Sequence, residues 1–256
     1  MESSSVQPTP MGTMQNGLAT PYNFAMGDLF AQAWHQVRGF KATFWGAVGF
    51  VFLIGMALGL INLFSLFPGV NKDLVQGIGK IVVTLVFLPL MIGISMLSVR
   101  RAVSLPVKAT DIFNYYRCFW RILGVYIGQM LIFAVIGLLI GLSASLSQNA
   151  PTLMISLLFL VLSSVLILLL IYLAIGYLFA MVLVAEKNLG IFQSLKASRK
   201  AVSQHWFKIF FAFILLDIVI AISAIPVFIG LIWTLPWLNM FCGMLYRTMF
   251  GVEEVR

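Results

Sequence analysis

Residues 122–185 form an uninterrupted run without a single Lys, Arg, Asp or Glu. A helix crosses the ~30 Å hydrocarbon core of a bilayer with about 20 residues, so this run of 64 residues has room for two crossings. Charged residues make up only 9% of the chain and hydrophobic residues 61%, whereas about 25% of a soluble domain is charged. The chain is therefore expected to be an all-α, polytopic membrane protein and neither a soluble globule nor a disordered chain.

Further uncharged runs cover residues 42–71, 81–99 and 209–246, the last interrupted only by Asp217. The polar patch Ser143–Pro151 divides the longest run. The last run favours two short helices over one span with a re-entrant segment, which makes six spans in all. The fourth span is long for one crossing and is expected to be tilted or to extend beyond the bilayer. The predicted spans are Phe44–Leu66, Ile78–Ser98, Ile122–Leu142, Thr152–Val184, about 209–225 and about 228–246.

The basic residues are distributed unevenly over the segments between these spans. Of the 16 Lys and Arg residues, 14 fall on one side of the membrane, and only Lys72 and Lys80 fall on the other. The positive-inside rule places the basic side, with both termini, in the cytoplasm. Residues 1–27 are expected to be a flexible cytoplasmic tail and not a signal peptide. A single transmembrane domain follows over 28–250, and residues 251–256 are expected to be a second short cytoplasmic tail.

Three segments of the chain begin alike, which predicts an internal repeat. They are Asp28-Leu29-Phe30, Asp111-Ile112-Phe113 and Gly190-Ile191-Phe192, and each leads into a short amphipathic stretch and then a span. The predicted unit is an interfacial amphipathic helix, a span that leaves the cytoplasmic side and a span that returns to it. The three pseudo-repeats cover about 28–108, 109–188 and 189–250.

The returning spans of the first and third repeats also share a motif. Pro89 lies 11 residues before Arg100, and Pro236 lies the same 11 residues before Arg247. A proline inside a helix removes a backbone hydrogen bond and bends the helix. We expect these kinks to serve packing between spans, with a transport path as the alternative.

Each repeat is expected to open with a helix whose apolar residues share one face, such as Leu29, Ala33 and Val37 in the first. Helices of this kind lie in the headgroup plane with the apolar face toward the hydrocarbon. The basic connectors would then meet anionic inner-leaflet headgroups, a protein partner or a second copy of the chain, unless they serve topology alone. No nucleic acid is expected to bind. This basic face consists of Arg100, Arg101, Arg117, Arg121, Lys196, Arg199, Lys200 and Lys208.

Asp217 is the only acidic residue inside a predicted span. It lies nine residues after Lys208, or ~13 Å along a helix, near the middle of the bilayer. Because a carboxylate is expensive at that depth, it marks a possible functional site for a proton or cation. The alternative is that it is protonated or hydrogen-bonded to Asn239 or Gln129. A small-solute or ion transporter that uses Asp217 is therefore the second predicted function.

Sequence signatures of enzymes are missing from the chain. It contains no GxxxxGK[ST] loop, no HExxH, no GxSxG and no CxxC motif, which are hallmarks of nucleotide hydrolysis, zinc proteolysis, acyl transfer and thiol chemistry. We expect a non-enzymatic protein with no catalytic residue, no bound metal and no cofactor. An enzyme that modifies lipids is a third alternative.

The run Leu88–Phe113 and the stretch Phe192–Phe250 carry a family pattern. It consists of a basic SLKASRKAV helix followed by Trp, then a span, a Pro-Trp pair in the last span, and Tyr-Arg before a short tail. Over residues 28–250 the chain resembles a broad group of uncharacterised bacterial multi-pass membrane proteins. That group is related to the membrane-anchoring domain of glycerophosphodiester phosphodiesterases.

This resemblance implies a six-helix protein of the bacterial inner membrane. The soluble phosphodiesterase barrel is absent from the sequence, so no phosphodiesterase chemistry is expected. The predicted function is that of a scaffold or accessory factor that engages lipid or a partner through its basic cytoplasmic face.

Overall fold

A computed structural model describes residues 24–60, 71–225 and 228–252. Every regular element in these residues is a helix. The tail over 1–23, the end of the first predicted span at 61–66 and the chain end at 253–256 lie outside the described residues. The elements are α2 (Met26–Val37), α3 (Lys41–Gly59), α4 (Lys72–Ala102), η2 (Ala109–Cys118), α5 (Phe119–Gln148), α6 (Leu153–Gly176), α7 (Ala180–Lys187), α8 (Ile191–Ser203), α9 (Trp206–Ala224) and α10 (Leu231–Phe250).

Five helical segments of the described chain are long and apolar enough to cross a membrane. They contain α3, α4, α5, α6 and α9, which correspond to the first five predicted spans. The sixth predicted span corresponds to α10, which is 20 residues long but carries Asn239 and Arg247 among its apolar residues. This composition suits its position, because α10 is largely buried against protein and has little need for an apolar outer surface.

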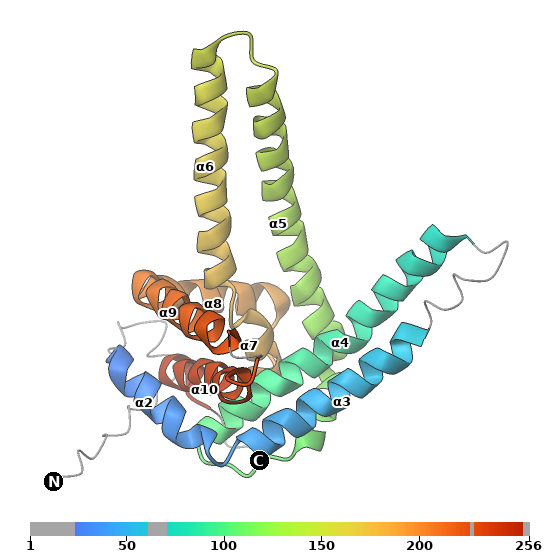
Figure 1. The fold of residues 1–256 in the computed structure, drawn as a ribbon, viewed down its shortest axis with the longest axis vertical. Helices are drawn as coiled ribbons and strands as arrows, with labels where there is room; N and C mark the ends of the chain where they lie inside the picture. The colour runs from blue at the N-terminus through green and yellow to red at the C-terminus, as the bar shows by residue number, and fades with distance from the viewer. Residues whose placement is uncertain (1–23, 61–70, 226–227, 253–256) are drawn as a thin grey trace.

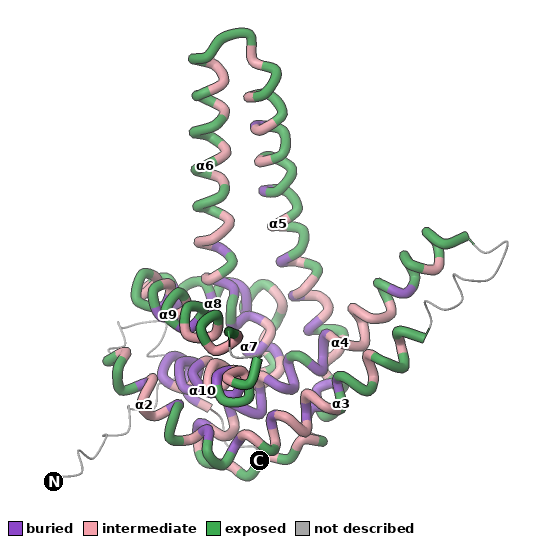
Figure 2. Tube along the Cα trace, in the orientation of Figure 1, coloured by how far each residue is buried: buried purple, intermediate pink, exposed green. Residues whose placement is uncertain are grey.

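Two helical hairpins project from a common base (Figure 1). The longer hairpin is formed by α5 and α6, and the other by α3 and α4. Figure 2 shows buried residues concentrated in the base and exposed residues along the outer parts of α5 and α6. Serine side chains join α5 to α6, with Ser143 Oγ 2.7 Å from Ser163 Oγ and Ser147 Oγ 3.1 Å from Ser156 Oγ. Small hydroxyl residues let apolar helices approach closely and bond across their interface.

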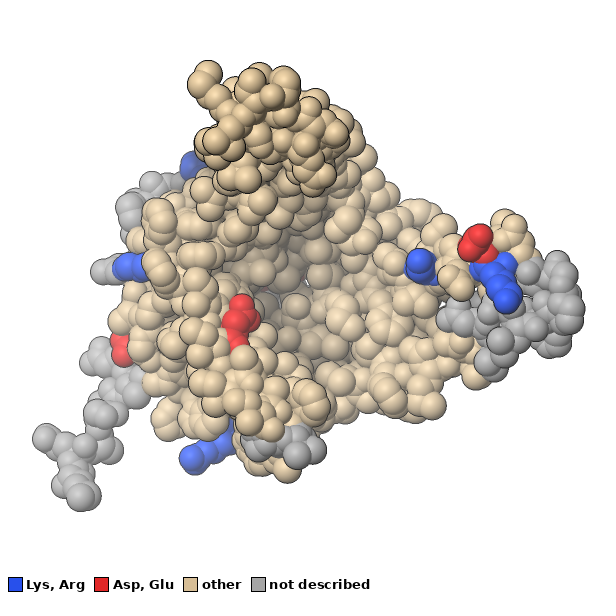
Figure 3. Space-filling model, turned by 45° about the horizontal axis from the view of Figure 1, so that its top comes forward, with Lys and Arg blue, Asp and Glu red and all other residues tan. Residues whose placement is uncertain are grey.

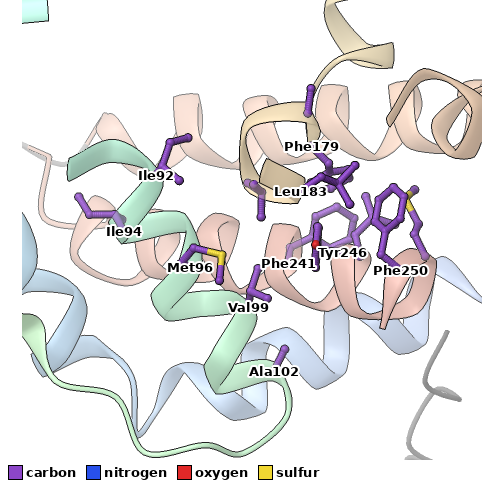
Figure 4. Close-up of a cluster of buried hydrophobic side chains, with 14 of the residues drawn as sticks. Ile92, Ile94, Met96, Val99, Ala102, Phe179, Leu183, Phe241, Tyr246 and Phe250 are labelled. Atoms are coloured by element: carbon purple, nitrogen blue, oxygen red, sulfur yellow. The ribbon is translucent and has the colours of Figure 1, made fainter. Parts of the chain in front are cut away.

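The base is organised around the crossing of α4 and α10. Figure 4 shows Ile92, Met96 and Val99 of α4 gathered with Phe241 and Tyr246 of α10 in one apolar cluster. The two backbones nearly touch at the crossing, because a Cβ atom on Gly243 would lie 2.5 Å from the carbonyl oxygen of Ser98. Only glycine permits this approach without displacing α4.

Each short helix packs against a helix that belongs to another predicted repeat. The pairs in contact are η2 with α4, α8 with the end of α6 and with α7, and α2 with α10. The last pair brings together the two ends of the described chain, because α2 is its first helix and α10 its last. In this pair the rings of Phe30 and Phe241 stack with their centroids 4.7 Å apart.

These contacts correct the expected placement of the short helices. Leu29, Ala33 and Val37 were expected to face the hydrocarbon, but they are buried within the protein. Leu195 on α8 is likewise buried, whereas Phe192 is 86% exposed. The apolar faces of α2 and α8 therefore pack mainly on the helical base, since the long helices offer a closer apolar surface there.

The fourth predicted span, expected as one long helix over Thr152–Val184, is instead broken. Helix α6 ends at Gly176, and α7 starts at Ala180 after a turn. Polar side chains satisfy the backbone groups at this break: Ser198 Oγ donates to Gly176 O at 2.8 Å and accepts from Phe179 N at 3.2 Å. Gln129 Nε2 donates to Tyr177 O at 3.0 Å. The turn is stable in an apolar interior because these side chains replace the missing helical hydrogen bonds.

Aromatic side chains donate hydrogen bonds to backbone oxygens near the two prolines that lie inside helices, Pro89 and Pro236. Trp45 Nε1 donates to Ile232 O at 3.0 Å, and Ile232 lies four residues before Pro236, which has no N–H to offer that carbonyl. Tyr116 Oη donates to Val86 O, three residues before Pro89, at 2.8 Å. Pro236 thus frees a carbonyl that Trp45 takes up, whereas the oxygen that Tyr116 reaches is next to that of Leu85, the carbonyl that Pro89 leaves without an N–H.

Ser198→Ala tests whether the α6–α7 break depends on this serine. Ser198 is buried, and its loss leaves a carbonyl and an N–H unpaired, so the free energy of unfolding should fall by about 1–3 kcal/mol. Ser203→Ala on the exposed face of the same helix should change it by less than about 0.5 kcal/mol. Unfolding in mixed detergent micelles, followed by circular dichroism, measures both. Equal effects of the two substitutions would contradict this role of Ser198.

Candidate functional site

The predicted basic face separates into structural and exposed members. Arg100 and Arg101 at the end of α4 are partly buried. The Arg100 guanidinium lies 5.8 Å from the centre of the Tyr115 ring, and Arg101 packs against Gly39. Both hold the end of α4 against its neighbours. The exposed members are Arg117, Arg121, Lys196, Arg199, Lys200 and Lys208.

Two of the exposed arginines line one pocket. Arg117 and Arg121 lie at the junction of η2 and α5 and face a cavity of about 530 Å³. Trp120 and Cys118 from the same junction also line it, and the opposite wall is Asn188, which follows α7. We call this cavity the basic pocket. It joins segments about 70 residues apart in the sequence.

Asn188 closes the pocket through direct contacts. Arg121 Nη1 donates to Asn188 Oδ1 at 3.1 Å and to its backbone oxygen at 3.4 Å. Cys118 Sγ lies 3.9 Å from the same Oδ1. Asn188 has a φ of 51° in the left-handed region, which asparagine tolerates better than most residues. This conformation ends α7 and turns the chain toward α8.

The electrostatics of the basic pocket favour an anion. The residues that line it include two arginines and no acid among the described residues. A guanidinium presents five N–H donors in a planar fork that matches phosphate and carboxylate oxygens. Trp120 is 79% exposed, and indole rings prefer the boundary between headgroups and hydrocarbon. The pocket thus combines cationic donors with an interfacial aromatic ring.

The outer face of α8 forms a second cationic surface. Lys196, Arg199 and Lys200 are exposed there, while Ser194 and Leu195 on the opposite face are buried. The aliphatic part of the Arg199 side chain packs over Gly176. A Cβ atom added at Gly176 would lie 3.4 Å from Arg199 Cγ. The α8 face is open, whereas the basic pocket is concave.

Lys208 and the histidine near it are engaged with an aromatic ring. Lys208 Nζ lies 5.7 Å from the centre of the Phe24 ring, and the His205 ring meets the same phenyl edge to face at 5.7 Å. This group fastens the start of α9 to the segment before α2. Lys208 therefore has a packing contact in addition to its exposure.

The three residues predicted around Asp217 do not form a hydrogen-bonded group. Asp217 is exposed on α9, Gln129 is bonded to the α6–α7 break, and the buried Oδ1 of Asn239 has no partner among the described residues. No hydrogen bond between described side chains joins any two of them. Sequence position alone placed all three within spans, but their partners depend on helix rotation and on the break.

Comparison of the chain with protein-family models, curated proteins and solved structures gives no match. The basic pocket and the α8 face are therefore interpreted from their own geometry. Sequence reasoning missed three pocket residues, Cys118, Trp120 and Asn188. Nothing in the order of residues places Asn188 beside Arg121.

The free energy of unfolding should fall when Gln129 loses its polar group and should hardly change when Asp217 does. Gln129→Met keeps the side-chain volume but removes one of the two donors to Tyr177 O, the other being Ala180 N at 3.1 Å, so the free energy of unfolding should fall by about 0.5–1.5 kcal/mol. Asp217→Asn alters an exposed side chain without a hydrogen bond in the described chain and should change it by less than about 0.5 kcal/mol. Detergent-micelle unfolding of both variants is the measurement. If Asp217→Asn lowers the free energy of unfolding more than Gln129→Met does, the structural role assigned to Gln129 is wrong.

Proposed function

We propose that this chain is a non-enzymatic protein of the bacterial inner membrane that crosses the bilayer six times in three pseudo-repeats. Its basic side and both termini face the cytoplasm. It acts there as a scaffold or accessory factor that engages anionic lipid headgroups. A protein partner at the same surface is the alternative engagement.

The order of elements supports the three pseudo-repeats. A short helix is followed by two longer helical segments three times, beginning at α2, η2 and α8. Each short helix contacts the returning helix of the repeat before it, and α2 contacts the returning helix of the last repeat. Side-chain donors accompany these contacts. Trp45 and Trp206, each near the start of an outgoing helix, donate to a carbonyl of α10 and of α6, respectively, and Tyr116 of η2 donates to a carbonyl of α4.

The distribution of charge supports the orientation. Figure 3 brings the tip of the α5–α6 hairpin toward the viewer, and most of the surface in this view is uncharged. Lys72 and Lys80 lie on the outer part of α4, whereas the basic pocket and the α8 face belong to the base of the molecule. An uneven distribution of cations of this kind is typical of a cytoplasmic side.

The observation that carries the lipid assignment is the polarity of α8. One face is buried in the protein and the other presents three cations to the surroundings. Cations held near a bilayer surface gain about 1 kcal/mol each from anionic lipid. A transporter that uses Asp217 has less support, because the structure gives this carboxylate no hydrogen-bonding neighbour in the described chain.

The double substitution Lys196→Gln with Lys200→Gln tests the α8 face. The protein, purified in a neutral detergent, is titrated with phosphatidylglycerol and the bound lipids are counted by native mass spectrometry. Two cations at about 1 kcal/mol each correspond to about a 30-fold loss of affinity.

A matched control removes two lysines from the other side, with Lys72→Gln and Lys80→Gln. Its affinity for phosphatidylglycerol should stay within about twofold of the unmodified protein. Equal affinities of the two double variants would show that the α8 cations serve topology alone.

A further inference from the structure

We infer that the basic pocket is a binding site for a phosphate group, carried by a lipid headgroup or present as the free anion. Such a site rests on the proposed function, because both require that the base of the molecule meets phosphates at the membrane surface. It is a different surface from the α8 face, so each can fail without the other.

The donors of the pocket are available to a ligand. Arg117 makes no hydrogen bond and no ion pair with any described residue, and Arg121 uses only Nη1, leaving Nη2 and Nε free within the described chain. Arg117 lies near the end of η2 and Arg121 in the first turn of α5, and both line the pocket. Two guanidinium forks therefore border one cavity.

Neighbouring carboxylates already have other partners. Asp111 accepts from the backbone N–H of Lys108 at 2.9 Å. Glu186 accepts from Tyr246 Oη and pairs with Lys187 Nζ at 3.6 Å. Neither residue lines the pocket. The charges of Arg117 and Arg121 are thus unneutralised by the described part of the chain, and an external anion is the natural counter-ion.

Asn188 orients one of the two forks. Its amide oxygen and backbone oxygen both accept from Arg121 Nη1, which holds the guanidinium at the pocket wall. A fixed fork loses less conformational freedom when it binds an oxyanion than a free one does. Asn188 is thus a positioning residue for the site.

The location and size of the pocket suit a headgroup. Arg121 directly precedes the uncharged run that starts at Ile122, so the pocket lies at the edge of the apolar region. Its volume of about 530 Å³ falls within the range of roughly 300–1,000 Å³ for small-molecule sites. Trp120 borders it with an exposed ring, against which the glycerol part of a phospholipid can pack.

Cys118 provides a local readout of occupancy, because it lines the pocket and is a free thiol. The full-length protein in neutral detergent is treated with N-ethylmaleimide, and the modification rate at Cys118 is followed by peptide mass spectrometry. We expect a saturating phosphate ligand to slow this rate by about fivefold or more, because a ligand that fills the pocket covers the thiol. Diacylglycerol, which has no phosphate, should leave the rate unchanged.

The ligands added distinguish the two sources of phosphate. Protection by phosphatidylglycerol or phosphatidic acid but not by inorganic phosphate identifies a lipid headgroup. Protection by inorganic phosphate alone identifies the free anion. An unchanged rate with all of these ligands would overturn the assignment.

Substitutions then tie protection to the arginines. Arg117→Gln with Arg121→Gln should abolish the protection, and Arg117→Lys with Arg121→Lys should weaken it, because lysine keeps the charge but loses the planar fork. Lys72→Gln with Lys80→Gln is the control of equal charge and should keep full protection. Each rate is compared with and without ligand in the same variant, so a changed intrinsic reactivity of Cys118 cancels. Protection that survives the double Gln change would contradict a phosphate site at these residues.

The lysine pair of α8 separates this site from the proposed function. If Lys196→Gln with Lys200→Gln loses phosphatidylglycerol binding while the unmodified protein shows no protection of Cys118, the α8 face stands and the pocket assignment fails. If protection of Cys118 persists while the α8 substitutions change nothing, the pocket stands and the wider lipid-binding face fails.

Discussion

A peptide group inside hydrocarbon must find its hydrogen-bond partner within the protein, because no water is present to replace it. This constraint is severe for a chain that interrupts its own helices. Pro89, Pro236 and the turn between Gly176 and Ala180 each leave backbone groups without a helical partner. At or beside each interruption, a side chain from another segment donates to a backbone oxygen. The interruptions are therefore among the points at which side chains join one helix to another.

The basic pocket is a consequence of one of these interruptions. Because α6 stops at Gly176, the chain forms the short helix α7, which ends at Lys187. Asn188 then adopts its left-handed conformation and meets Arg121 at the start of α5. A continuous helix through residues 176–180 would carry Asn188 to a different place relative to Arg121. The hydrogen-bonded break between α6 and α7 thus contributes to the position of the basic pocket.

The positions of most long helices could be predicted from the sequence, because uncharged runs and polar turns follow directly from the cost of burying charge. The junction between α5 and α6, at residues 149–152, overlaps the end of the predicted polar break Ser143–Pro151, but residues 143–148 continue α5 as a helix. The break after Gly176 could not be predicted, since the surrounding residues are uniformly apolar and the stabilising partners, Gln129 and Ser198, come from other helices. The apolar faces of the short helices were identified correctly in part, but their burial in protein was not foreseen.

The candidate site was predictable only as a set of cations. Charge near the ends of spans indicated Arg117 and Arg121, and it indicated Arg100 and Arg101 equally. Their separation into pocket and packing residues depends on tertiary neighbours such as Asn188 and Tyr115. An arginine that lines the pocket and one that packs against a neighbouring helix cannot be distinguished in the sequence.

A double-mutant cycle between Trp45 and Pro236 tests the central claim most directly. Pro236→Ala restores an N–H four residues after Ile232, so the carbonyl that Trp45 satisfies no longer depends on it. Trp45→Phe should therefore cost about 0.5–1.5 kcal/mol more in the native background than in the Pro236→Ala background, measured by unfolding in mixed micelles. The same cost in both backgrounds would show that the indole does not compensate for the proline, and would contradict the claim that captured carbonyls fasten this fold.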